Sequence, residues 1–130
     1  VEAHADFQLV ISYNPGYQSV LKEIKPSTRQ RFVALDFDYP EAAVEAGIVA
    51  TEGGVDAETA RRLVKLAELT RNLKGAGLDE GASTRLLVHA AQLIADGVLP
   101  ATACTAAVAR ALTDDPEMTG TLDDLVHAVF

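Results

Sequence analysis

Apolar and polar positions divide the chain near residue 39 into a part with strand-like runs and a part with helical periodicity. Residues 7–13 form an almost continuous apolar run with β-branched members, which is typical of a strand buried on both faces of a parallel sheet. The run stops at Asn14-Pro15-Gly16. Residues 32–37 alternate as a second strand would, and the spacing allows a parallel crossover. Two strands make a poor sheet alone, so we expect neighbouring strands outside this chain.

From Pro40 onward the pattern predicts only helices. The first expected helix spans Pro40 to about Gly53, and the second begins at Asp56 and is ended by Gly75 and Gly77. The third begins at Ser83, the fourth runs from about Pro100 to Leu112, and the last begins at Thr121. The residues expected to face the core are Ala60, Leu63, Val64 and Ala67 in the second helix and Leu87, Ala90, Ala91 and Ile94 in the third. Asp56 and Ser83 are the expected N-caps. The fold class is therefore an α/β remnant, residues 1–39, followed by an all-α bundle, residues 40–130.

Composition and charge narrow the classes of protein that remain. Apolar residues make up 48% of the chain, only 5% is aromatic, and the formal net charge is −8. That charge argues against nucleic-acid binding, including binding through a helix-turn-helix. Cys104 is the only cysteine, which suits a small core residue in a reducing cytoplasm. No run is long enough to span a membrane, and the start at Val1 suggests a piece of a longer protein.

Asn14, Arg29 and Arg31 are polar residues at the expected strand boundaries. Ligands bind at the carboxyl ends of strands in open α/β sheets, but Asn14-Pro15-Gly16 also has the composition of a simple turn. Arg29 and Arg31 would share one face of an extended segment and could reach one anion. The alternative is a solvated pair that neutralises nearby carboxylates.

Arg85 is expected in the first turn of a helix, where the macrodipole disfavours a cation by about 0.3–1 kcal/mol. Free N–H groups at that end suit an anion, so an arginine beside them fits a phosphate site. A salt bridge to Asp79 or Glu80 is an equally good interpretation. The histidines show no metal-ligand spacing, and Gly75-Ala76-Gly77 lacks the lysine and the strand of a phosphate loop.

Three strings follow one another along the chain: Leu9–Ser19 (LVISYNPGYQS), Lys25–Phe32 (KPSTRQRF) and Glu80–Leu86 (EGASTRL). Together they resemble the CbbQ/NirQ/NorQ branch of the MoxR AAA+ ATPases. The resemblance covers essentially the whole chain. It implies that residues 1–39 are the C-terminal part of the AAA+ core and that residues 40–130 are the helical lid.

The resemblance also implies roles for the four polar residues. Asn14 would be the sensor-1 residue that orients the attacking water. Arg31 would be the arginine finger that reaches the nucleotide of the neighbouring subunit, assisted by Arg29, and Arg85 would be sensor 2. Phosphoryl transfer needs positioning and charge neutralisation, which these residue types supply. ATP and Mg²⁺ would be bound mainly by an upstream P-loop segment that this chain lacks, so the chain alone is expected to be inactive.

The implied function is that of an ATP-hydrolysing remodelling chaperone, assembled as a hexameric ring. Its partner would carry a von Willebrand factor A domain, and its target would be Rubisco or nitric oxide reductase. The alternative is a non-enzymatic helical interaction module, which leaves the position of Arg85 and the apolar run at residues 7–13 unexplained.

Overall fold

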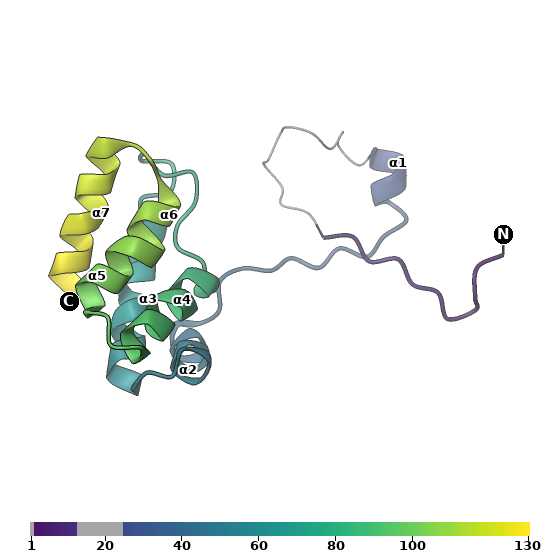
Figure 1. Cartoon of the computed structure of the whole chain (residues 1–130). Coiled ribbons are helices and arrows are strands. Elements are labelled where there is room, and N and C mark those ends of the chain that lie inside the picture. The colour runs from purple at the N-terminus through teal and green to yellow at the C-terminus, as the bar shows by residue number, and fades with distance from the viewer. Residues whose placement is uncertain (1, 13–24) are drawn as a thin grey trace. The chain divides into compact units, whose positions relative to one another are not determined.

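A computed structural model describes residues 2–12 and 25–130 of the chain (Figure 1). The chain divides into two units, Val1–Phe37 and Asp38–Phe130. The elements, in order, are α1 (Pro26–Arg29), α2 (Ala42–Gly53), α3 (Ala57–Arg71), α4 (Thr84–Ala95), α5 (Pro100–Cys104), the π-helical turn η1 (Thr105–Ala109), α6 (Arg110–Leu112) and α7 (Pro116–Val129). None of the helices in the described ranges combines the length and apolar character that crossing a bilayer requires.

The two predicted strands are not observed in the described part of the first unit. Residues 7–12 and 33–37 have no regular secondary structure. Their apolar side chains are exposed, with Val10 at 86%, Val33 at 91% and Phe37 at 92%. A strand forms only where neighbouring backbone satisfies its N–H and C=O groups, and the described residues offer no such neighbour. Residue 13, the last of the first predicted strand, lies outside the described residues.

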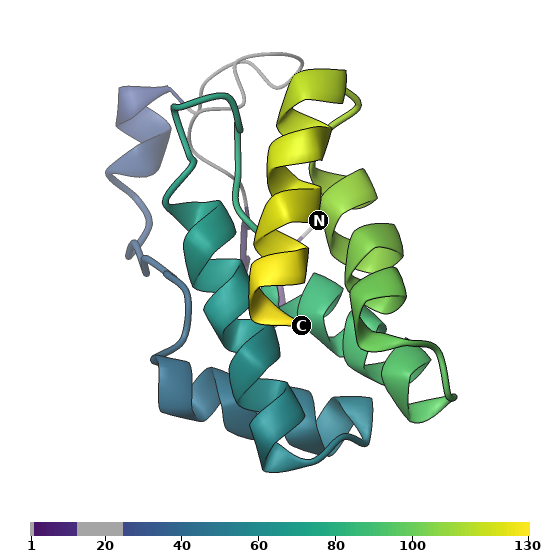
Figure 2. The same ribbon diagram turned by 90° about the vertical axis from the view of Figure 1, so that its left-hand side faces the viewer.

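The prediction of a helical bundle after residue 40 is confirmed in the second unit. α2 packs against α3 and α4, and α4 packs against α5 and η1. α7 packs against α3 and η1, and Figure 2 shows it lying between α3 and the α5–η1–α6 segment. The bundle is therefore closed by the last helix in the sequence.

α3 supplies one wall of the core, as its periodicity predicts. Ala60, Leu63, Val64 and Ala67 are all buried. Asp56 caps the helix, because its carboxylate accepts hydrogen bonds from the N–H groups of Glu58 at 2.9 Å and Thr59 at 3.0 Å. These bonds hold the pKa of Asp56 below its ordinary value. On α4, Leu87, Ala90 and Ala91 are buried and Ile94 packs partly buried against the core.

α2 and α4 touch at Gly53, and the contact requires glycine. A Cβ added to Gly53 would collide with the Cβ of Ala91. Gly54 then ends α2 in the left-handed conformation, with φ of 70°, and donates its N–H to the Ala50 carbonyl at 3.1 Å. This is the usual glycine solution at a helix C-terminus, and the sequence predicts the helix end at this Gly-Gly pair. The helix begins at Ala42, two residues later than the proline suggests.

The predicted fourth helix is continuous from Pro100 to Leu112 but contains the π-helical turn η1. The buried residues of this segment come in two pairs, 103–104 and 108–109, which are five positions apart. That spacing matches the i→i+5 hydrogen bonding of a π turn. The wide turn therefore keeps both pairs on the core side.

The last helix begins at Pro116 rather than at the predicted Thr121. Asp115 is the N-cap and accepts a hydrogen bond from the N–H of Met118 at 2.8 Å. Proline at the first helical position is pre-organised for helix and needs no N–H partner. The capping-box character of residues 121–124 predicts the later start. In the structure these residues lie inside α7, whose Leu122 and Val126 are buried.

Candidate functional site

Arg85 lies in the first turn of α4, and its side chain is exposed. Ser83 occupies the N-cap position, but its side chain makes no capping hydrogen bond, so that part of the cap prediction is wrong. The N–H groups at this helix end therefore lack the usual side-chain acceptor. Within residues 25–130, no hydrogen bond or ion pair joins Arg85 to Asp79 or Glu80. The salt-bridge interpretation of Arg85 thus has no support in the described part of the chain.

A buried ion pair links α2 to the last residue of α3, close to the start of α4. Glu45 is fully buried, and the Arg71 side chain is 14% exposed. Two guanidinium nitrogens of Arg71 donate to the two carboxylate oxygens of Glu45, at 2.8 and 2.7 Å. The Thr84 hydroxyl donates to the same carboxylate at 2.6 Å. Bidentate, charge-assisted bonds of this kind are what a buried carboxylate requires.

Arg71 also holds the segment that leads into α4. Its Nε donates to the Ala82 carbonyl at 3.0 Å, and its guanidinium lies over the Tyr39 ring, 3.7 Å from the centroid. The Tyr39 hydroxyl donates to the Gly81 carbonyl at 3.4 Å. We call Tyr39, Glu45, Arg71 and Thr84 the Glu45–Arg71 network. It ends at Thr84, the residue directly before Arg85.

The charge state of Glu45 follows from two opposed effects. Burial raises the pKa of its carboxyl, but the hydrogen bonds from Arg71 and Thr84 and the positive charge of Arg71 lower it further than burial raises it. The pKa of Glu45 is therefore below its ordinary value, and the residue is ionised at neutral pH. The network holds a true carboxylate–guanidinium pair.

The other predicted site residues belong to the first unit. Asn14 lies outside the described residues. Arg29 ends α1, and Arg31 follows in a turn, where its N–H donates to the Thr28 carbonyl at 3.0 Å. Because this segment is not extended, the shared face expected for the two arginines is not observed. Both side chains are exposed.

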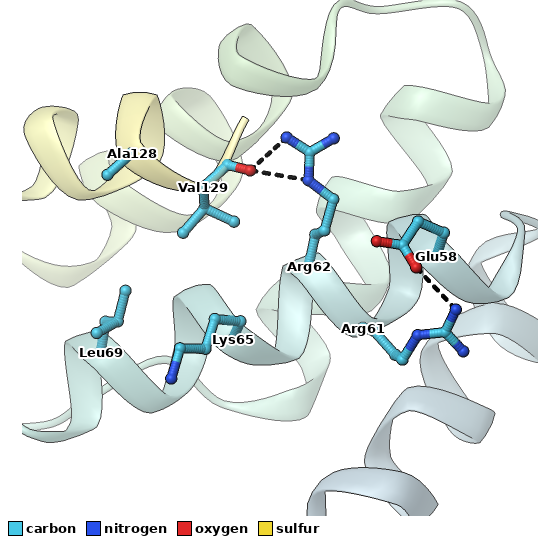
Figure 3. Close-up of a pocket in the computed structure, with 7 residues that line it drawn as sticks. All are labelled: Glu58, Arg61, Arg62, Lys65, Leu69, Ala128 and Val129. Carbon is cyan, nitrogen blue, oxygen red and sulfur yellow. Dashed lines mark hydrogen bonds and ion pairs between the residues drawn. The ribbon is translucent and has the colours of Figure 1, made fainter.

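A groove of about 470 Å³ lies between α3 and the end of α7 (Figure 3). Its lining residues are Glu58, Arg61, Arg62, Lys65, Leu69, Ala128 and Val129. The cations of the groove already have partners. Arg61 pairs with Glu58 at 2.7 Å, and Arg62 donates through Nε to the Val129 carbonyl at 2.8 Å. Arg62 also lies 4.5 Å from the centroid of the Phe130 ring. These contacts attach the end of α7 to α3, and Arg85 is not among the residues that line the groove.

Cys104 is a buried core residue, as the sequence suggests. Burial raises the pKa of its thiol to about 12, although the Arg62 charge lowers it in part. We expect no reaction of the native chain with a thiol-specific reagent at pH 8, because thiolate is the reactive form. One equivalent should react in denaturant, as measured by absorbance and mass. Stoichiometric labelling of the native chain would contradict this assignment.

Across the described ranges, no three His, Cys, Asp or Glu side chains gather in a metal-binding arrangement.

The sequence matches a family model described as CbbQ/NirQ/NorQ C-terminal over residues 45–129. The chain belongs to the CbbQ/NirQ/NorQ family. The match contains Arg85 and most of the Glu45–Arg71 network, and the resemblance drawn from the three sequence strings is confirmed.

Several curated relatives are similar to the whole chain. The chain is 57% identical over 130 residues to the protein CbbQ of Hydrogenophilus thermoluteolus, covering 49% of that protein. It is 53% identical to the protein NorQ of Paracoccus denitrificans, of which it covers 48%. It is 51% identical to the denitrification regulatory protein NirQ of Stutzerimonas stutzeri, of which it covers 47%. In all three comparisons the whole of this chain is covered. The chain therefore spans about half the length of the curated relatives it matches.

Sequence reasoning missed the Glu45–Arg71 network of this family member. A signal for it was present, because Arg71 stands four residues after the buried Ala67 and Glu45 four residues before the buried Val49. Each charge therefore continues an apolar helical stripe. The sequence pattern does not indicate that the two residues form a pair, because they are 26 positions apart.

Proposed function

We propose that this chain is the C-terminal part of a MoxR-type AAA+ ATPase and that Arg85 is its sensor-2 residue. The observation that carries the proposal is an exposed arginine at the uncapped start of α4, inside the region that matches the family model. Helix N–H groups and a guanidinium together form a suitable contact for a phosphate. Membership of the family favours this function over a separate helical interaction module.

The residues of this chain would act on ATP through position and charge. Arg85 would contact the nucleotide of its own subunit, and Arg31, assisted by Arg29, would reach the nucleotide of the next subunit. Asn14 would orient the attacking water. ATP supplies the phosphoryl group, and Mg²⁺ would be bound mainly by an upstream P-loop segment. Arginines fit this division, because they neutralise phosphate charge but do not coordinate a metal.

We further propose that the complete protein works as a remodelling chaperone in the cytoplasm. It would form a hexameric ring and act with a partner that has a von Willebrand factor A domain. The target would be Rubisco or nitric oxide reductase. The proposal draws on the resemblance and on relatives that carry the names CbbQ, NirQ and NorQ.

The sensor-2 role is tested with Arg85→Ala in the complete protein, meaning this chain with the remaining length that its relatives have. We expect ATP turnover and the response to nucleotide to weaken. The fold should be unchanged or slightly more stable, because a cation at a helix N-terminus costs about 0.3–1 kcal/mol. Arg61→Ala, which removes an exposed arginine paired with Glu58, is the matched control. Wild-type turnover by folded Arg85→Ala would reject the sensor-2 role.

A further inference from the structure

The segment directly before α4, residues 81–83, has no regular secondary structure. Hydrogen bonds nevertheless hold its consecutive residues Gly81 and Ala82. The Thr70 hydroxyl accepts a hydrogen bond from the N–H of Ala82 at 3.0 Å, and Arg71 donates to the carbonyl of the same residue. Tyr39 donates to the carbonyl of Gly81. A Cβ on Gly81 would lie only 2.5 Å from the Arg71 Cα and 2.7 Å from its backbone nitrogen. The segment therefore lies directly on the last turn of α3.

The start of α4 is fixed by this network instead of by a conventional cap. Ser83 is in the N-cap position but makes no side-chain capping bond. The next side chain, Thr84, is bound to the buried Glu45 carboxylate, and that carboxylate is oriented by Arg71. Arg71 thus binds both the Ala82 carbonyl and the Glu45 carboxylate that anchors Thr84. Arg71 itself is not placed to contact a phosphate, since only 14% of its side chain is exposed.

We propose that Arg71 is a positioning residue for Arg85. By holding the Glu45 carboxylate and the Ala82 carbonyl together, it sets where α4 begins and in which direction Arg85 meets the phosphates of ATP. This inference rests on the proposed sensor-2 role of Arg85. A shift of about 1 Å at a phosphate contact can cost about 100-fold in rate, so the orientation of the first turn matters to turnover.

The test is a double-mutant cycle in the complete protein, measured as kcat/KM for ATP hydrolysis. Arg71→Lys keeps the positive charge near Glu45 but cannot donate to both carboxylate oxygens and to Ala82 in the same planar arrangement. We expect Arg71→Lys to lower kcat/KM by about 5- to 100-fold when Arg85 is present. In the Arg85→Ala background the same change should have less than about a twofold effect, because the residue through which it acts is gone.

Arg62→Lys is the matched control. Arg62 also lies on α3, donates to a backbone carbonyl and covers an aromatic ring, but its partners are Val129 and Phe130 rather than the start of α4. Its thermal destabilisation should resemble that of Arg71→Lys. Its effect on kcat/KM should be small and the same with and without Arg85.

The possible outcomes separate the two proposals. Equal fold losses from Arg71→Lys in both Arg85 backgrounds, or no loss in either, would make Arg71 a structural residue only. Wild-type turnover by Arg85→Ala would instead overturn the sensor-2 role itself. If Arg71→Lys does not fold, Thr84→Val takes its place in the same cycle, since it removes the hydroxyl that binds Glu45 and keeps the side-chain shape. Its loss should likewise vanish in the Arg85→Ala background, and persistence of that loss would reject the proposal.

Discussion

Glu45→Ala is expected to lower the free energy of unfolding of the helical unit by about 3–5 kcal/mol. The change leaves Arg71 largely buried without its carboxylate partner, and it also removes the acceptor of the Thr84 hydroxyl. Urea unfolding of the 130-residue chain, followed by far-UV circular dichroism, measures the effect. Glu58→Ala breaks the exposed pair with Arg61 and should cost less than about 1 kcal/mol. Equal losses from both variants would show that the buried pair contributes no more than a surface pair.

Acid provides a second measure of the same interaction. The folded state holds the pKa of Glu45 below its ordinary value, so the folded state binds fewer protons than the unfolded chain. The stabilisation is therefore complete above the ordinary glutamate pKa of about 4.3 and is lost as pH falls through the folded pKa. The difference in unfolding free energy between the wild-type chain and Glu45→Gln should shrink below about pH 4. Other carboxylates, such as Asp56, cancel in this comparison. A constant difference from pH 7 to pH 3 would contradict the assignment.

Arg31→Ala is expected to reduce ATP turnover of the complete protein by about 10³- to 10⁵-fold, the range for arginine fingers that act in trans. Assembly and ATP binding should persist, because the proposed role of Arg31 is confined to the nucleotide of the neighbouring subunit. Steady-state hydrolysis measures the loss. Arg29→Ala is the comparison and should be milder.

Mixed rings test whether the arginine acts between subunits. Arg31→Ala subunits are combined with subunits that keep Arg31 but lack the Walker B carboxylate, which would help to bind Mg²⁺ in the upstream part of the protein. Some interfaces then join an intact nucleotide site to an intact finger, so activity should return although each parent is inactive. Co-purification of two tags establishes that mixed rings form. Mixed rings without activity would assign Arg31 a structural role.

The helical half of the chain was largely predictable, because its signals are local. Asp56 caps α3 through bonds to residues two and three positions away, and Leu63 and Leu87 lie on apolar stripes with helical spacing. The start of α7 was also encoded locally, in Asp115-Pro116, but the capping-box character of residues 121–124 favoured the later start at Thr121. The family could be read from three short strings, one of which contains Arg85.

Whether a segment forms a strand, and whether Glu45 meets Arg71, depends on contacts between residues far apart in the sequence. No local pattern contains these contacts. Residues 7–12 and 33–37 have the composition of strands, yet a strand needs a neighbour to bind its backbone, and their side chains are exposed in the structure. The sequence determined the helical unit, many of its core residues and the place of Arg85 in the first turn of a helix, because periodicity and capping act within a few residues. Only the tertiary structure decided that Glu45 and Arg71 meet at the start of α4, because that pair depends on how three helices pack together.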